Sequence, residues 1–240
     1  PGLRAGGLSI VSAATPRLTI RPTREEFHRL AADYTVVPVW TELLADLDTP
    51  VAAFIKLVGE GEGFLLESVE HGERWARYSF VGHDPVATIE LRGATIEVRG
   101  QRLTPSFPTD QGILAALDAL VAAYRAPMMA DLPPLQGGVM GYLGYDVVRE
   151  VEHLPHAAFD DRRLPDAVMS IIGSLVAFDH WRQRMYLIES VPVLEMRGGD
   201  LDREYDAAIE RIEAAAARLA VPLAVPPVEL PLAGEEPPDV

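Results

Sequence analysis

Two long apolar runs in the second half of the chain place the strongest constraint on its fold. The first is "DAVMSIIGSLVAFDH", residues 166 to 180, and the second is "RMYLIESVPVL", residues 184 to 194. Because Arg182 and Gln183 lie between them, we predict that the runs form a hairpin of two β-strands. Strands this uniformly apolar are typical of a sheet that is covered on both faces, so the core is expected here.

Shorter β-rich runs fill the first half of the chain. They are "GFLLESVE", "WARYSFVG", "VATIELRG" and "ATIEVRG", within residues 63 to 100, and most of them end at a glycine. The last two read as a hairpin that turns at Arg92 and Gly93. We predict that these runs form an antiparallel meander.

Helix signals separate the predicted strands. Thr23 and Glu26 have the spacing of a capping box, and Thr49 followed by Pro50 is typical of a helix start. Asp110 is the predicted N-cap of a helix over "GILAALDALVAAYRA", whose apolar spacing should cover one face of a sheet. A last amphipathic helix is predicted over residues 199 to 220, with acidic residues at its start.

This order of elements predicts an α+β fold, with largely antiparallel β-sheets and helices packed on the outside. We expect a flexible leader over residues 1–20 and one folded region over residues 21–220. Residues 221–240 are rich in proline and acidic residues without a helical or strand period, which is typical of a linker. A linker implies a further domain, although a free terminus has the same composition.

The composition removes several classes of function. The chain has no cysteine, which excludes disulfides, thiolate zinc sites and cysteine nucleophiles. Its formal net charge is −15 and Lys56 is its only lysine, so it lacks the clustered basic residues that bind nucleic acid. It contains no run of about 18 apolar residues and no signal-peptide pattern at the start. We therefore expect a cytoplasmic protein with neither a nucleic-acid nor a membrane partner.

Motifs for catalysis or metal binding are missing from the sequence. Gly138, Gly141 and Gly144 recur every three residues, which matches neither the dinucleotide-binding nor the P-loop glycine pattern. We interpret them as part of a strand that packs closely against another backbone. The histidines lack the spacing of metal ligands, and no GxSxG elbow marks a nucleophilic serine. The sequence therefore predicts no catalytic and no metal-ligating residue in this chain.

An apolar strand ends abruptly on two polar residues in the stretch "FLLES". Glu67 and Ser68 follow Leu66 with no turn residue between them. Because side chains alternate between the two faces of a strand, one of the two polar side chains should face inward. An inward polar group without a partner costs about 1–3 kcal/mol, so it requires one.

Two kinds of partner are possible for this polar group. One is internal, such as Arg74, Arg77 or a backbone amide, as is usual for buried polar residues. The other is the ammonium and amide groups of a small ligand. The spacing of the residues leaves both open.

Larger patterns around this stretch resemble a known family. "FLLESVEHGERWARYSFVG" closely resembles the signature near the start of anthranilate synthase component I, the large, chorismate-using subunit. "GGVMGYLGYDVVREVEHLP" is similar to a second signature of the same N-terminal region, and "VPVWTELLADLDTPVAAFIKL" to the segment before the first. The resemblance extends from about residue 17 to residue 219. It implies the chorismate-utilising, anthranilate synthase-like fold.

The resemblance also implies a role for this chain. In the family, the LLES element belongs to the site for feedback inhibition by L-tryptophan. Leu66 would then contact the indole ring, Glu67 and Ser68 would lie near the polar end of the amino acid, and Arg77 is the best match for a basic residue on the next strand.

The reacting groups of the family lie elsewhere. Chorismate and Mg²⁺ are bound by the C-terminal half of the subunit, and a glutamine amidotransferase subunit supplies ammonia. The resemblance therefore implies that this chain is an N-terminal regulatory and scaffolding part, expected to be inactive alone, which contacts its own C-terminal catalytic domain. Two alternatives are the same part of aminodeoxychorismate synthase and a free-standing amino-acid-binding module.

Overall fold

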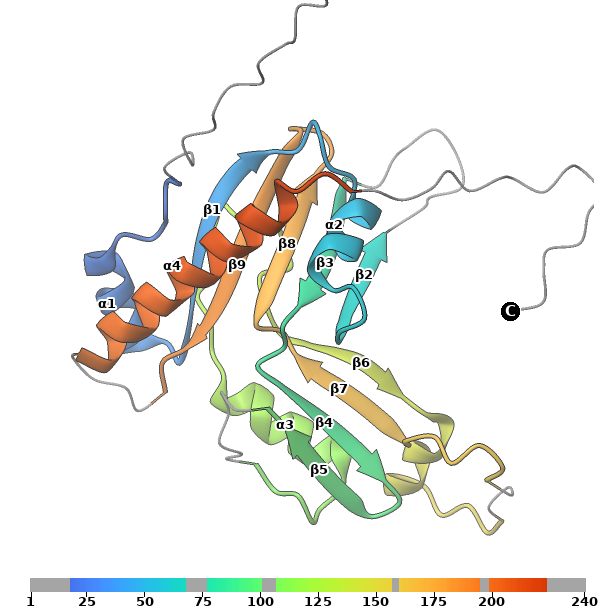
Figure 1. Cartoon of the computed structure of the whole chain (residues 1–240). Coiled ribbons are helices and arrows are strands. Elements are labelled where there is room, and N and C mark those ends of the chain that lie inside the picture. The colour runs from blue at the N-terminus through green and yellow to red at the C-terminus, as the bar shows by residue number, and fades with distance from the viewer. Residues whose placement is uncertain (1–17, 68–76, 101–106, 157–159, 195–198, 224–240) are drawn as a thin grey trace, which may run out of the picture.

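The computed structural model describes residues 18–67, 77–100, 107–156, 160–194 and 199–223 (Figure 1). The helices are α1 (Arg24–Asp33), α2 (Pro50–Leu57), α3 (Ile113–Ala123), η1 (Tyr145–Glu150, a 3-10 helix) and α4 (Gly199–Leu219). The strands are β1 (Val36–Leu44), β2 (Gly63–Glu67), β3 (Tyr78–His83), β4 (Ala87–Arg92), β5 (Thr95–Arg99), β6 (Val139–Leu143), β7 (Ala167–Ile171), β8 (Ser174–Asp179) and β9 (Arg184–Pro192).

The strands form two antiparallel sheets. The first sheet has the order β1-β9-β8-β3-β2, and the second has the order β5-β4-β7-β6. Figure 1 shows α1, α2 and α4 over one face of the first sheet, whereas α3 packs against the second sheet. The predicted α+β class with antiparallel sheets and external helices is therefore confirmed. None of the described helices is both long and apolar enough to cross a membrane.

One bent two-stranded ribbon joins the two sheets. β3 pairs with β8 in the first sheet. β4, which follows β3, pairs with β7, which precedes β8, in the second sheet. At the bend, residues 84–86 lie opposite residues 172 and 173, which gives one side an extra residue and forms a bulge. Asp84 has a φ of 45° there, and Pro85 has no N–H to donate to a ladder.

This ribbon corrects two predictions from the sequence. The predicted meander is wrong, because β3 and β4 lie in different sheets and each pairs with a strand from the second half of the chain. The run over residues 166–180 is two strands, since β7 ends at Ile171 and β8 starts at Ser174 in the other sheet. The hairpin of β8 and β9 and the hairpin of β4 and β5 are confirmed.

Apolar packing covers the central strands on both faces, as predicted. Every residue of β8 is buried. The face toward the helices packs Val37, Val39, Val81, Val176 and Leu187 against Leu57, Ala208 and Ile212. The opposite face packs Trp40, Leu175, Ala177, Tyr186 and Ile188 against Leu132, with Met129 and Leu135 partly buried beside them. In the second sheet, Ile89, Leu91 and Ile96 pack against Ile113, Ala116 and Leu120 of α3.

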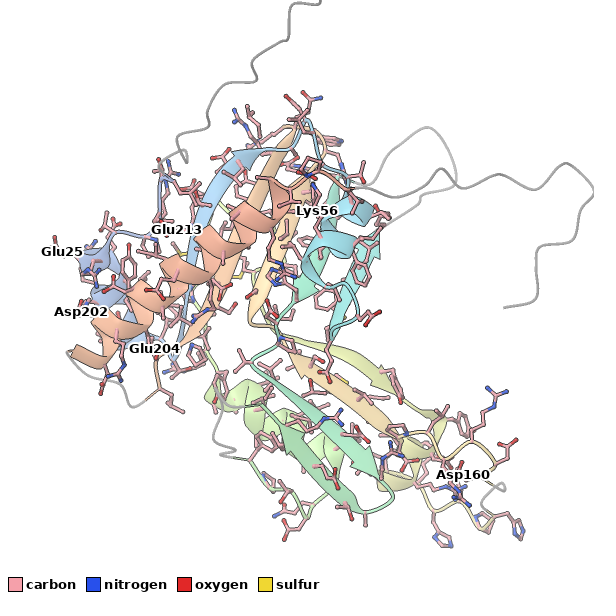
Figure 2. All side chains as sticks on the ribbon, in the orientation of Figure 1. Glu25, Lys56, Asp160, Asp202, Glu204 and Glu213 are labelled. Carbon is pink, nitrogen blue, oxygen red and sulfur yellow. The ribbon has the colours of Figure 1, made fainter. Side chains whose placement is uncertain are left out.

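Polar contacts fix the helices on the first sheet. Lys56, the only lysine, donates to the carboxylate of Asp48 and to the backbone oxygen of Leu219, each at 2.6 Å. Figure 2 shows its place beside the C-terminal end of α4. At the other end of α4, Asp202 accepts from Arg24 and lies 3.0 Å from Nε2 of His28, both in α1. These contacts link α1 and α2 to α4.

The predicted helix caps are found in two of three cases. Thr23 and Glu26 form the capping box of α1, and the Thr49 hydroxyl accepts from Ala52 N–H at the start of α2. The predicted N-cap Asp110 is wrong. Gly112 is the N-cap of α3 and the Glu150 carboxylate accepts from the N–H groups of Ile113 and Leu114, at 2.7 and 3.0 Å.

Gly112 allows this cap because it has a φ of 87°, and a Cβ there would lie 2.6 Å from the Glu150 side chain. We predict that Glu150→Gln lowers the free energy of unfolding by about 1–2 kcal/mol, because a neutral amide replaces a carboxylate at the positive end of the helix. Urea titration monitored by circular dichroism measures this. The exposed neighbour Glu152 provides the control, and equal effects of Glu150→Gln and Glu152→Gln would contradict the assigned cap.

Candidate functional site

The stretch singled out in the sequence lies at the end of an edge strand. β2 is the outermost strand of the first sheet, and its last residues pair with β3, Leu66 opposite Phe80 and Glu67 opposite Ser79. Leu66 is 38% exposed and Glu67 is also exposed. The inward polar side chain predicted for this stretch is therefore not that of Glu67, and Ser68 lies outside the described residues.

The predicted alternation of faces along β2 is present. Leu65 packs against the core on the helix side of the sheet, whereas Phe64 packs against the core on the opposite side. Leu66 therefore shares the second face with Phe64, and it lies next to Phe80 across the strand pair. The rings of Tyr78 and Phe80 are 6.1 Å apart, so Leu66 borders an apolar strip that includes two aromatic rings.

Arg77, the predicted basic partner, is held by a carboxylate of another strand. It directly precedes β3, and its Nη2 donates to Oδ2 of Asp179 at 2.8 Å while its Nε donates at 3.2 Å to Oδ1. The guanidinium also lies 4.7 Å from the ring centroid of Tyr78 and 5.2 Å from that of Trp181. The internal partner of Arg77 is thus Asp179 and not Glu67. The bonds use Nε and Nη2, and Nη1 has no hydrogen-bond acceptor among the residues that the structure describes.

Asp179 is the buried anchor of this cluster. Its side chain is 2% exposed, and it also accepts from the backbone N–H groups of Trp181 and Arg182, both at 3.2 Å. Burial by itself raises the pKa of Asp179, but the Arg77 guanidinium and the two N–H groups together bring this pKa below its ordinary value. The same hydrogen bond to Asp179 raises the pKa of Arg77. Both groups are therefore charged in the folded protein at neutral pH.

The sequence indicated neither Asp179 nor its neighbours as site residues. His180, next to Asp179, has its Nε2 2.8 Å from the Ser79 hydroxyl, and its ring stacks on Phe178 at 6.4 Å. These residues reach Arg77 and Ser79 only through the pairing of β3 with β8, in which Tyr78 lies opposite Asp179. To find Asp179 and His180 from the sequence, the pairing of β3 with β8 would have had to be predicted.

The arrangement combines an apolar surface with a charged hydrogen-bond donor. An exposed leucine and two aromatic rings provide an apolar surface, and a fixed guanidinium provides a donor for a carboxylate. Glu67 directly follows Leu66, but by the alternation along β2 it shares the helix-side face with Leu65, and it is exposed at the last residue of the strand. In the described part of the chain, no group of three or more His, Cys, Asp or Glu side chains could hold a metal ion.

Comparison with known proteins identifies the family. The chain is 34% identical over 225 residues to anthranilate synthase component 1 of Mycolicibacterium smegmatis, and the match covers 92% of the chain and 41% of that protein. It is 36% identical over 212 residues to the protein of the same name from Mycobacterium tuberculosis, covering 86% of the chain and 40% of that protein. The chain belongs to the anthranilate synthase component 1 family. The resemblance stated from the sequence is thus confirmed.

The match covers only part of the length of these family members. The chain spans 38% of the anthranilate synthase component 1 of Acetivibrio thermocellus, with 32% identity over 192 residues, so it corresponds to about two fifths of such a protein. A solved structure of anthranilate synthase component I from Streptococcus pneumoniae superimposes with a TM-score of 0.44 and 21% identity, covering 76% of the chain and 37% of that structure. No family model matches the chain.

The Arg77–Asp179 pair provides a test of the site's geometry. We predict that Asp179→Asn lowers the free energy of unfolding by about 1–3 kcal/mol at pH 7, because Arg77 loses its buried counter-charge. The lowered pKa of Asp179 stabilises the fold above the ordinary aspartate value of about 4, and this stabilisation is lost as the pH falls through the lower folded-state pKa. Urea titrations from pH 7 to pH 3 should therefore show a shallower pH dependence in Asp179→Asn.

The control for this experiment is Asp46→Asn, which removes an exposed carboxylate near the same end of the sheet. It should leave both the stability and its pH dependence close to those of the original chain. An Asp179→Asn variant that matches this control would show that the pair does not hold this end of the sheet.

Proposed function

We propose that this chain is the N-terminal regulatory and scaffolding part of an anthranilate synthase component I in the cytoplasm. The complete enzyme would convert chorismate, with glutamine or ammonia, to anthranilate and pyruvate for tryptophan biosynthesis. Family membership supports the reaction, and the surface beside the end of β2 supports the regulatory role. The proposal assigns this surface to L-tryptophan, the end product of such a pathway.

The observation that carries the regulatory role is the placement of Arg77 beside the exposed end of β2. Asp179 and two aromatic rings hold its guanidinium in place, so little side-chain entropy would be lost when Nη1 donates to a ligand carboxylate. Leu66, with Phe80 opposite it, offers the apolar contact that an indole ring requires. The ligand would therefore lie with its ring over Leu66 and its carboxylate toward Arg77.

The ammonium group of the ligand requires an acceptor at the end of the strand. The exposed carboxylate of Glu67, which projects on the face of Leu65, would reach the ligand around the end of the strand, and the hydroxyl of Ser68 is the next side chain along the sequence. A hydrogen bond to a charged group contributes about 1.5–3 kcal/mol, and allosteric coupling amounts to about 1–3 kcal/mol. Loss of one such bond could therefore remove most of the feedback inhibition.

The reaction itself is assigned to the part of the family that this chain does not cover. The proposed Mg²⁺ and chorismate sites belong to a C-terminal catalytic domain, and Mg²⁺ would supply charge stabilisation for chorismate there. The described residues of this chain would bind the feedback ligand and support that domain. A glutamine amidotransferase subunit is the proposed source of ammonia, and the chain by itself is expected to be inactive.

Substitutions at the end of β2 test the regulatory proposal in the complete enzyme. We predict that Ser68→Ala, Ser68→Arg and Glu67→Gln leave turnover without tryptophan near normal but raise the half-inhibitory tryptophan concentration about tenfold or more. The reason is the loss of an acceptor for the ligand ammonium, or a steric block in Ser68→Arg. Initial rates of anthranilate formation against tryptophan concentration provide the measurement.

The matched control is Glu97→Gln, which removes an exposed carboxylate from the edge strand β5 of the other sheet. Its half-inhibitory concentration should stay within about twofold of the original value. Unchanged inhibition in all three site variants, with normal folding, would refute the assignment of tryptophan to this surface. Formation of aminodeoxychorismate instead of anthranilate would refute the proposed reaction and leave the site open to test.

A further inference from the structure

A second concave site lies at the bend of the ribbon, at the opposite end of β2. A pocket of about 340 Å³ opens where the start of β2 and the end of β3 in one sheet meet β6 and β7 in the other. This volume is at the lower end of the range for small-molecule sites. The start and end of the five-residue strand β2 are roughly 13 Å apart, so this pocket is separate from the surface around Glu67.

The polar side chains in the lining of the pocket are those of Glu62, His83, Tyr142, Ser170 and Ser174. Glu62 is a lining residue whose side chain is 54% exposed, and its carboxylate accepts from the Thr88 hydroxyl at 2.6 Å, while Thr88 in turn lies 3.3 Å from the hydroxyl of Ser170. His83 also lines the pocket and is only 6% exposed. Its Nδ1 lies 2.9 Å from the carboxylate of Asp84.

Positive side chains are missing from the lining. No lysine or arginine contributes to the wall of this pocket in the described part of the chain, and Arg99 approaches Glu62 only at 3.7 Å from outside the lining. Anionic ligands would therefore meet the carboxylate of Glu62 inside the pocket, while its cationic partner Arg99 lies outside the lining. A ligand that donates hydrogen bonds, above all a cationic amine, fits this set of groups.

Apolar side chains provide the rest of the wall. Phe64, Met140 and Ile172 line the pocket together with Pro85 and Val168. A phenylalanine and a methionine are favourable contacts for an aromatic ring. Backbone also forms part of the wall, because Gly82 and Gly141 carry no side chain.

The geometry points to a binding site for a small aromatic amine in this pocket. The ring would lie among Phe64, Met140 and Ile172, and the ammonium would donate to the carboxylate of Glu62. His83 and Ser170 would accept or exchange further hydrogen bonds with the amine. The ligand needs no carboxylate, which separates its chemistry from that of the amino acid proposed for the surface beside Arg77.

Three probes of nearly equal size test this site on the chain itself. Isothermal titration calorimetry in 150 mM salt compares 2-phenylethylamine, a cation, with neutral 2-phenylethanol and anionic phenylacetate. We expect the amine to bind about tenfold or more tightly than the alcohol, and phenylacetate to bind most weakly. Equal affinities for the three probes, or no binding of the amine at millimolar concentration, would overturn the proposal.

Two carboxylates in the stretch "GEGEG" provide a matched pair of variants. Glu62→Gln should weaken binding of the amine about tenfold while changing binding of the alcohol by less than about twofold. Glu60→Gln removes the same charge from an exposed residue outside the lining, and it should bind the amine as the original chain does. If both variants weaken the amine equally, general attraction to a chain of net charge −15 explains the binding, and the site is refuted.

Discussion

Pairing of β3 and β4 with β8 and β7 is the constraint on which the rest of the structure depends. This ribbon runs through both sheets, and each half places its strands in the centre of one of them. The hairpin partners β2, β5 and β9 and the strand β6 then add to it, and the helices cover the outer faces. The bulge around Asp84 allows the ribbon to turn from one sheet to the other without losing the ladder on either side.

The same ribbon positions both candidate sites. At its far end, the register of β3 and β8 brings Asp179 to Arg77, and so fixes a guanidinium beside the exposed end of β2. At its bend, the two sheets diverge and the pocket around Glu62 and His83 opens between their edges. Bulges are frequent next to functional sites because they redirect side chains and interrupt pairing. We propose an amino acid as the ligand of the surface and an amine as the ligand of the pocket.

The sequence predicts the parts of this structure that are determined by near neighbours. The capping box at Thr23 and the two hairpins each arise from residues a few positions apart, and both are found as predicted. The division of the run at residues 166–180 is not visible locally, because the apolar residues continue through Ile172. The same holds for Glu150, which lies 37 positions from the N–H group that it caps, and for Asp179, 102 positions from Arg77. The predicted inward polar side chain is not that of Glu67, which is exposed as the last residue of the edge strand β2.

Direct contact between bound tryptophan and Leu66 tests the central claim most sharply. The measurement is a nuclear Overhauser experiment on the complete enzyme with labelled leucine methyl groups, saturated with L-tryptophan. The account predicts transfer from the indole protons to the Leu66 methyl groups and none to Leu65, which packs on the opposite face of the sheet. Saturated binding with transfer to methyl groups elsewhere, and none to Leu66, would contradict it.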